Sequence, residues 1–134
     1  MGKRLAEQGH QPDLIISSPA KRAFATAKKI ARETGYAKSD IRKEEDLYFA
    51  GIFKMCQVLE DLGDDYDRVM MVGHNPALTK LLNTLSDTSI HNLPTCAVAI
   101  LRFDFESWSD LGEDDGVLVG YDYPKGPGDF ESLV

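Results

Sequence analysis

The sequence predicts an α/β domain with three layers, in which a mainly parallel sheet is covered by helices on both faces. Short apolar runs that are typical of buried strands alternate along the chain with amphipathic runs of helical spacing. Such alternation is typical of parallel sheets covered on both faces. Two strand-like runs near the C-terminal end, 97–104 and 116–123, have an acidic loop between them and predict an antiparallel hairpin.

The first half of the chain is expected to hold two helices and two strands. A helix is predicted over 2–8, and the apolar run 13–17 predicts a strand. The next helix covers 20–34, and a weaker strand covers 41–44. A glycine follows each of the two helices and is a natural residue to end it.

The second half is expected to hold two helices around another strand. The run 50–62 is amphipathic, and its apolar side is expected to hold Phe53, Val58, Leu59 and Leu62. A strand over 67–73 precedes a helix over 77–85, in which leucines recur at helical spacing. The hairpin predicted above completes the sheet.

Size and composition fit one domain. The chain has 134 residues, enough for a single core of modest size, so we expect one domain over 1–134. The last residues, 124–134, are rich in glycine and proline and are expected to form a flexible tail.

The net charge of −7 argues against general binding to nucleic acid or to an anionic membrane, because both require a basic surface. No apolar run reaches the length of a membrane span.

Cys56 and Cys96 lack the spacing of metal ligands, so we expect free buried thiols in a reducing compartment. The predicted location is the cytoplasm.

His74 stands where the predicted strand 67–73 gives way to a helix, in the string Val72-Gly73-His74-Asn75-Pro76. Pro76 suits the first turn of the following helix. In open α/β sheets, ligands bind in the crevice at the carboxyl ends of the strands, where this imidazole is expected to lie. The alternative is a histidine that only packs in a turn.

Arg22 follows the end of another predicted strand, after the string Ser17-Ser18-Pro19. It falls in the first turn of the predicted helix, where backbone N–H groups have no partner within the helix. A guanidinium and free N–H groups at a strand end can hold a phosphate. The alternative is that Arg22 is one of several solvated cations on a basic helix.

Taken together, the strings around Arg22 and His74 resemble the histidine phosphatase superfamily, and most closely its small bacterial branch, the SixA-like phosphohistidine phosphatases. Segments 46–50, 92–99 and 103–111 also look like that branch, so the resemblance covers nearly the whole chain in order. The resemblance implies a phosphoglycerate mutase-like fold and a phosphate pocket that needs no metal or other cofactor.

The resemblance also implies roles for individual residues. Arg22 would bind the phosphoryl oxygens and neutralise the charge that develops on them. His74 would donate a hydrogen bond to the same oxygens as the second histidine of the pocket. Ser18 and Asn75 would line the pocket as substrate-binding residues. Glu45 is a candidate general acid, although three adjacent carboxylates are more often a solvated run.

The sequence departs from the family at the nucleophile. The family's attacking histidine lies in an Arg-His-Gly motif after the first strand, and the chain contains no such motif. Neither His10 nor His91 is expected to replace it. We therefore expect a domain that is N-terminally truncated and lacks its first strand, with covalent catalysis impaired and with exposed strand edges that promote self-association.

The predicted function is removal of phosphate from histidine on a phosphorylated protein, by the full-length form of the domain. One alternative is a phosphatase of small phosphomonoesters on the same scaffold. Another is a non-catalytic domain that binds phosphate or regulates a partner. No nucleic-acid or membrane partner is expected.

Overall fold

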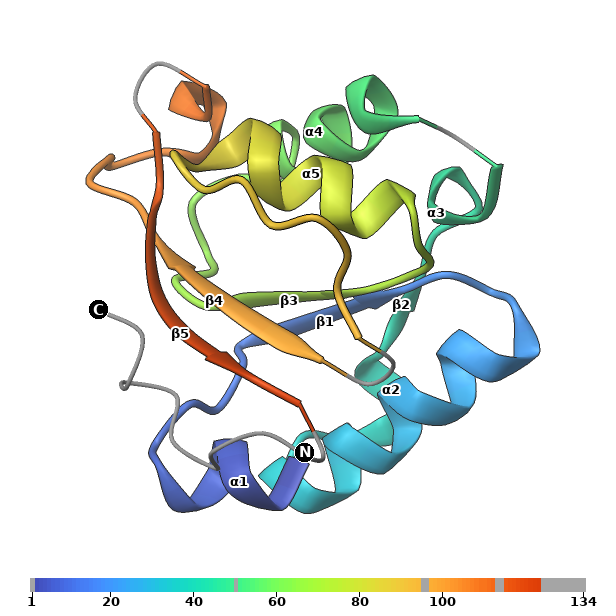
Figure 1. The fold of residues 1–134 in the computed structure, drawn as a ribbon. Coiled ribbons are helices and arrows are strands. Elements are labelled where there is room, and N and C mark those ends of the chain that lie inside the picture. The colour runs from blue at the N-terminus through green and yellow to red at the C-terminus, as the bar shows by residue number, and fades with distance from the viewer. Residues whose placement is uncertain (1, 50, 95–96, 113–114, 124–134) are drawn as a thin grey trace.

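The computed structural model describes residues 2–49, 51–94, 97–112 and 115–123 (Figure 1). Within these ranges the helices are α1 (Gly2–Glu7), α2 (Lys21–Thr34), α3 (Asp46–Phe49), α4 (Ile52–Glu60) and α5 (Ala77–Leu85), with 3-10 turns η1 (Lys38–Asp40) and η2 (Trp108–Asp110). The strands are β1 (Leu14–Ser17), β2 (Arg42–Lys43), β3 (Val69–Val72), β4 (Val98–Arg102) and β5 (Val117–Asp122). The tail predicted over 124–134 and Cys96 lie outside the described residues.

A parallel sheet lies at the centre, with strand order β2-β1-β3. The register pairs Ser17 of β1 with Lys43 of β2 on one side and with Val72 of β3 on the other. All four residues of β1 are buried, as expected for the middle strand of a sheet covered on both faces. Because the strands are parallel, the residues that follow Ser17 and Val72 emerge at the same edge.

Helices cover both faces of this sheet, as predicted. On one face Ile15 of β1 packs with Ala27 and Ala31 of α2. On the other face Leu14 and Ile16 pack in the larger core, which also holds Met55 and Leu59 of α4 and Leu81 and Leu85 of α5. Figure 1 shows α2 below the sheet and α4 and α5 above it. Adjacent residues of β1 thus serve opposite cores, which is the alternation that a strand imposes.

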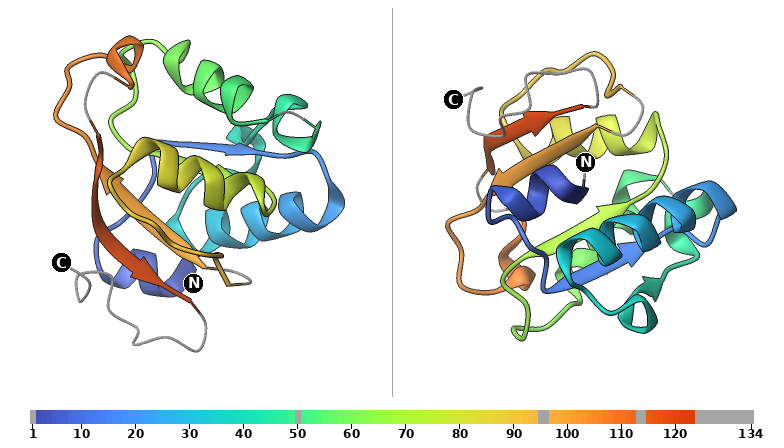
Figure 2. Two further views of the ribbon diagram at one scale, coloured as in Figure 1. Left: turned by 45° about the horizontal axis from the view of Figure 1, so that its top comes forward. Right: turned by 90° about the horizontal axis from the view of Figure 1, so that it is seen from below.

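The C-terminal hairpin is antiparallel, as predicted, and forms its own two-stranded sheet of β4 and β5 among the described residues. A register shift between Ile100 and Leu101 bends it. Helix α1 lies beside α2 (Figure 2) and holds the far end of β5, because Arg4 Nη1 bonds the buried Asp122 carboxylate at 2.9 Å. The hairpin is therefore tied to the first helix.

The helix predicted over 50–62 differs from the structure in two respects. The helix is shorter at both ends, from Ile52 to Glu60, and the short helix α3 precedes it. Phe53, predicted on the apolar side, is 80% exposed, and that prediction was wrong. Met55 and Leu59 lie one turn apart and define the buried side of α4, so Phe53 points away from it.

None of the helices found in the described ranges combines the length and the apolar character that crossing a bilayer requires.

Candidate functional site

The predicted site residues Ser18 and His74 meet at the carboxyl edge of the parallel sheet. The backbone N–H of Ser18 donates to Val72 O at 2.9 Å, which extends the pairing of β1 and β3 by one residue. Two residues after Val72 the chain reaches His74, whose carbonyl oxygen accepts from Leu78 N–H at 2.9 Å as α5 begins. The strand ends therefore place both side chains without help from a flexible loop.

A hydrogen bond joins the two side chains, with Ser18 Oγ 2.9 Å from His74 Nε2. The Ser18 oxygen also accepts from Ala20 N–H at 3.2 Å, in the turn that leads into α2. Ser18 is fully buried, whereas the His74 ring is only partly buried. One edge of the imidazole is thus fixed by a buried hydroxyl.

The direction of this hydrogen bond follows from the surroundings of Ser18. Ser18 is fully buried and its Oγ already accepts from Ala20 N–H, so its hydroxyl proton is satisfied when it points to His74 Nε2. We therefore assign the Ser18 O–H as the donor, which requires Nε2 to be unprotonated in the neutral ring. The ring proton of neutral His74 then sits on Nδ1.

Arg22 is exposed in the first turn of α2, four residues after Ser18. It makes no ion pair with any carboxylate in the described ranges. Its backbone N–H is among those at the helix start that have no partner within α2, and no side chain caps this end of the helix. The guanidinium is therefore available to an anion, and the hydrogen bond of His74 Nε2 goes to Ser18 and not to Arg22.

Asn75 has a structural task that the sequence did not reveal. Its Oδ1 accepts from Thr79 Oγ1 at 2.8 Å and from Thr79 N–H at 3.2 Å, and its Nδ2 donates to Leu93 O at 2.8 Å. Thr79 Oγ1 accepts in turn from Leu93 N–H at 3.0 Å. The four-residue spacing of Asn75 and Thr79 on one helix end was the available signal. The substrate contact predicted for Asn75 stays a prediction.

Glu45 follows β2 at the same edge of the sheet, since the N–H of the preceding Glu44 donates to Ser17 O at 2.9 Å. It is exposed and forms no ion pair within the described ranges. His10 precedes β1 and therefore lies toward the opposite edge, and His91 is exposed in the loop before Leu93. The loop of His91 reaches the start of α5 at Leu93, whose carbonyl oxygen accepts from Asn75.

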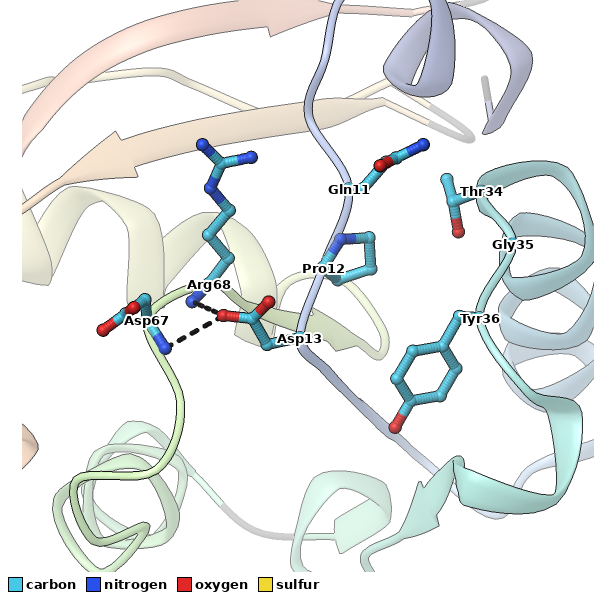
Figure 3. A pocket seen from close by; sticks show the side chains of 8 residues that line it. All are labelled: Gln11, Pro12, Asp13, Thr34, Gly35, Tyr36, Asp67 and Arg68. Carbon is cyan, nitrogen blue, oxygen red and sulfur yellow. Dashed lines mark hydrogen bonds between the residues drawn. The ribbon is translucent and has the colours of Figure 1, made fainter.

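A hollow of about 410 Å³ lies at the other edge of the sheet, lined in part by Asp13, Tyr36 and Arg68 (Figure 3). Asp13 Oδ2 accepts from the backbone N–H groups of Asp67 and Arg68 at 3.1 and 3.0 Å. Arg68 Nη1 donates to Gly9 O at 2.9 Å. The polar groups of this hollow serve to join the chain before β1 to the chain before β3, away from His74.

No group of three His, Cys, Asp or Glu side chains that could hold a metal ion occurs within the described part of the chain.

Comparisons with known proteins concern the fold. No family model matches the chain. Two proteins from two strains of Mycobacterium tuberculosis, each described as uncharacterized, are 28% identical to it over 123 residues, covering 84% of this chain and 74% of each relative. A solved structure from Nakamurella multipartitia, described as "Putative Phosphohistidine Phosphatase SixA", is similar with a TM-score of 0.72. That match has 20% identity and covers 93% of this chain and 78% of the other.

This chain has the fold of that SixA structure. The predicted class is thereby confirmed: a parallel sheet between helices with an antiparallel C-terminal hairpin.

Proposed function

We propose that this chain is a phosphohistidine phosphatase-like domain that binds a phosphoryl group at the carboxyl edge of its parallel sheet. The observation that carries the proposal is the Ser18–His74 hydrogen bond, because it fixes an imidazole at the edge where α2 begins with an exposed Arg22. The SixA-like fold supports the same choice.

In this proposal Arg22 binds two phosphoryl oxygens through its planar guanidinium, which offers paired N–H donors. The imidazole of His74 binds the same group. Both interactions strengthen as charge spreads over the oxygens during transfer, so they lower the barrier as well as aid binding. Asn75 has at least a structural role in this proposal, because its side chain joins the first turn of α5 to the loop at Leu93.

The proposal also identifies the source of the nucleophile. Attack on phosphorus requires a nucleophile opposite the leaving group, and the sequence contains no Arg-His-Gly motif. We propose that the nucleophile is a histidine of an Arg-His-Gly segment supplied upstream. It would form a bond to phosphorus as the substrate imidazole leaves, and water would then release phosphate. Without that segment the chain is expected to bind phosphate but to turn over poorly, in the cytoplasm where we place it.

The test uses a labelled phosphohistidine donor protein and measures acid-labile phosphate on this chain. No phosphohistidine is expected on the chain itself, and addition of an upstream strand that ends in Arg-His-Gly is expected to restore labelling and release. Arg22→Gln or His74→Gln in the extended protein should abolish release, with Lys54→Gln as the control. Robust turnover by the present chain that depends on His74 would contradict the missing-nucleophile proposal.

A further inference from the structure

Helix α2 presents an almost wholly cationic face to solvent. Its exposed positions are Lys21, Arg22, Ala25, Lys28, Lys29 and Arg32. Each residue advances an α-helix by about 100°, so these positions fall within an arc of about 120°. Every exposed side chain of the helix except that of Ala25 therefore carries a positive charge on one stripe.

Strand β2 continues this stripe toward the candidate site. Lys43 Nζ lies 4.3 Å from the centre of the Phe24 ring, and Lys28 Nζ lies 5.2 Å from the same centre. The register pairs Lys43 with Ser17, so Lys43 is at the carboxyl edge. We call the set of Lys21, Arg22, Lys28, Lys29, Arg32 and Lys43 the cationic face.

The protein does not neutralise this face internally. The ion pair found within the described ranges joins Arg4 to Asp122, and none of the six cations takes part in one. These six side chains are two fifths of the chain's 15 Lys and Arg residues, although the chain has 22 acidic residues and a net charge of −7. Like charges on one helix repel, so the arrangement costs some stability unless an anionic partner covers it.

We propose that the cationic face is the docking surface for an acidic patch of a partner protein, and that this partner carries the phosphoryl group to the site. The inference rests on the proposed function, because Arg22 belongs both to the phosphoryl site and to the first turn of the cationic helix. A partner that lies along α2 makes contacts over about 20 Å and brings its phosphorylated residue to the end where Ser18 and His74 meet.

The surroundings favour a protein over a nucleic acid. Acidic residues follow β2 directly, at Glu44, Glu45 and Asp46, and they would repel a polyanion that runs past the end of the face. A compact acidic patch on a protein can bind α2 and β2 without extending over these acidic residues. Complementary charge of this kind speeds association and selects partners more than it raises affinity.

The test maps binding by amide NMR shifts with three probes. These are a synthetic peptide of alternating Glu and Ser, a peptide of the same length in which Gln replaces Glu, and an oligothymidylate of equal charge. The acidic peptide is expected to shift amides of 21–32 and 43 at low salt, with the shifts lost as salt is added. The neutral peptide is expected to cause none.

Two double variants with the same change in net charge separate the effect of the cationic face on binding from the effect of overall charge. Lys28→Gln/Lys29→Gln should weaken binding of the acidic peptide about fivefold, as expected for two exposed charge pairs. Lys54→Gln/Lys80→Gln removes the same charge from α4 and α5, on the opposite side of the sheet, and should leave binding unchanged. Equal losses in both variants, shifts confined to other residues, or tighter binding of the oligothymidylate would overturn the inference.

Inorganic phosphate separates the two proposals. If phosphate fails to shift the residues around Arg22 and His74 while the peptide still binds at α2, the proposed function fails and an acidic docking partner remains. If phosphate binds there while the acidic peptide does not bind the face, the docking inference fails and the phosphoryl site remains.

Discussion

Ser18→Ala offers the sharpest test of how the site is organised. The variant removes the hydroxyl that accepts from Ala20 N–H at 3.2 Å and that bonds His74 Nε2 at 2.9 Å. A hydrogen bond contributes about 1 kcal/mol net, so the loss of both predicts about 2 kcal/mol of destabilisation. For a chain of this size that corresponds to a fall in Tm of roughly 8 °C.

Ser17→Ala is the matched control. Ser17 is also fully buried and precedes Ser18 directly, but its hydroxyl donates to Ser18 O at 2.9 Å and does not touch His74. The loss of one bond predicts about 1 kcal/mol and a fall in Tm of roughly 4 °C. Thermal unfolding followed by circular dichroism measures both variants.

The site-specific readout is the tautomer of the neutral His74 ring, observed by ¹⁵N NMR. The wild-type ring is expected to carry its proton on Nδ1. Ser18→Ala should move the ring toward the Nε2-protonated form, and Ser17→Ala should leave it unchanged. A wild-type ring protonated on Nε2, or the same tautomer in all three proteins, would refute the reasoning.

Three further predictions concern stability and reactivity. Arg4→Met should lower the free energy of unfolding by about 3 kcal/mol, because it leaves the buried Asp122 carboxylate without its guanidinium. Urea unfolding measures this loss, and a loss smaller than that of Ser17→Ala would contradict the prediction. Burial, and then the nearby Glu60 carboxylate, raises the pKa of the Cys56 thiol, so the thiolate forms only at higher pH than usual. In a Cys96→Ser background, alkylation of Cys56 at mildly alkaline pH should be slower in the folded protein than in urea, and equal rates would exclude the effect. Strand β3 pairs with β1 alone among the described residues, so light scattering should show self-association that increases with concentration, and a monomer at every concentration would count against it.

The sequence predicted those parts of the fold that local patterns specify. Strands β1 and β3 are short apolar runs, and α2 and α5 have helical spacing with clear ends. Gly35, for example, adopts φ 77° and its N–H donates to Ala31 O, as a left-handed helix stop should. The predicted bounds of α5 agree with the structure because Pro76 and the leucine spacing mark both of its limits.

Other parts depend on contacts between distant residues. Phe53 was assigned to the wrong side of α4, because a local pattern does not show which side meets α5 and the sheet. Arg4 and Asp122 are 118 positions apart, and no local signal pairs them. The hairpin's separate sheet also depends on long-range pairing.

The candidate site has features of both kinds, some predicted from local sequence and some dependent on contacts between distant residues. Ser18 and His74 were each predicted as pocket residues at strand ends, and the parallel register of β1 and β3 brings these ends together. Their direct hydrogen bond joins residues 56 positions apart and could not be predicted. The hydrogen bonds between Asn75 and Thr79 were also missed, because the sequence alone does not distinguish a structural contact from a ligand contact.

The measurement that tests the central claim most directly is a titration of the chain with inorganic phosphate, followed by NMR shifts of the Arg22 guanidinium and the His74 ring. The account predicts that both groups shift together, that Arg22→Gln weakens phosphate binding about tenfold or more through the loss of charged hydrogen bonds, and that Lys54→Gln does not. Phosphate that shifts neither group, or that binds equally well to Arg22→Gln, would contradict a phosphoryl site at this edge of the sheet.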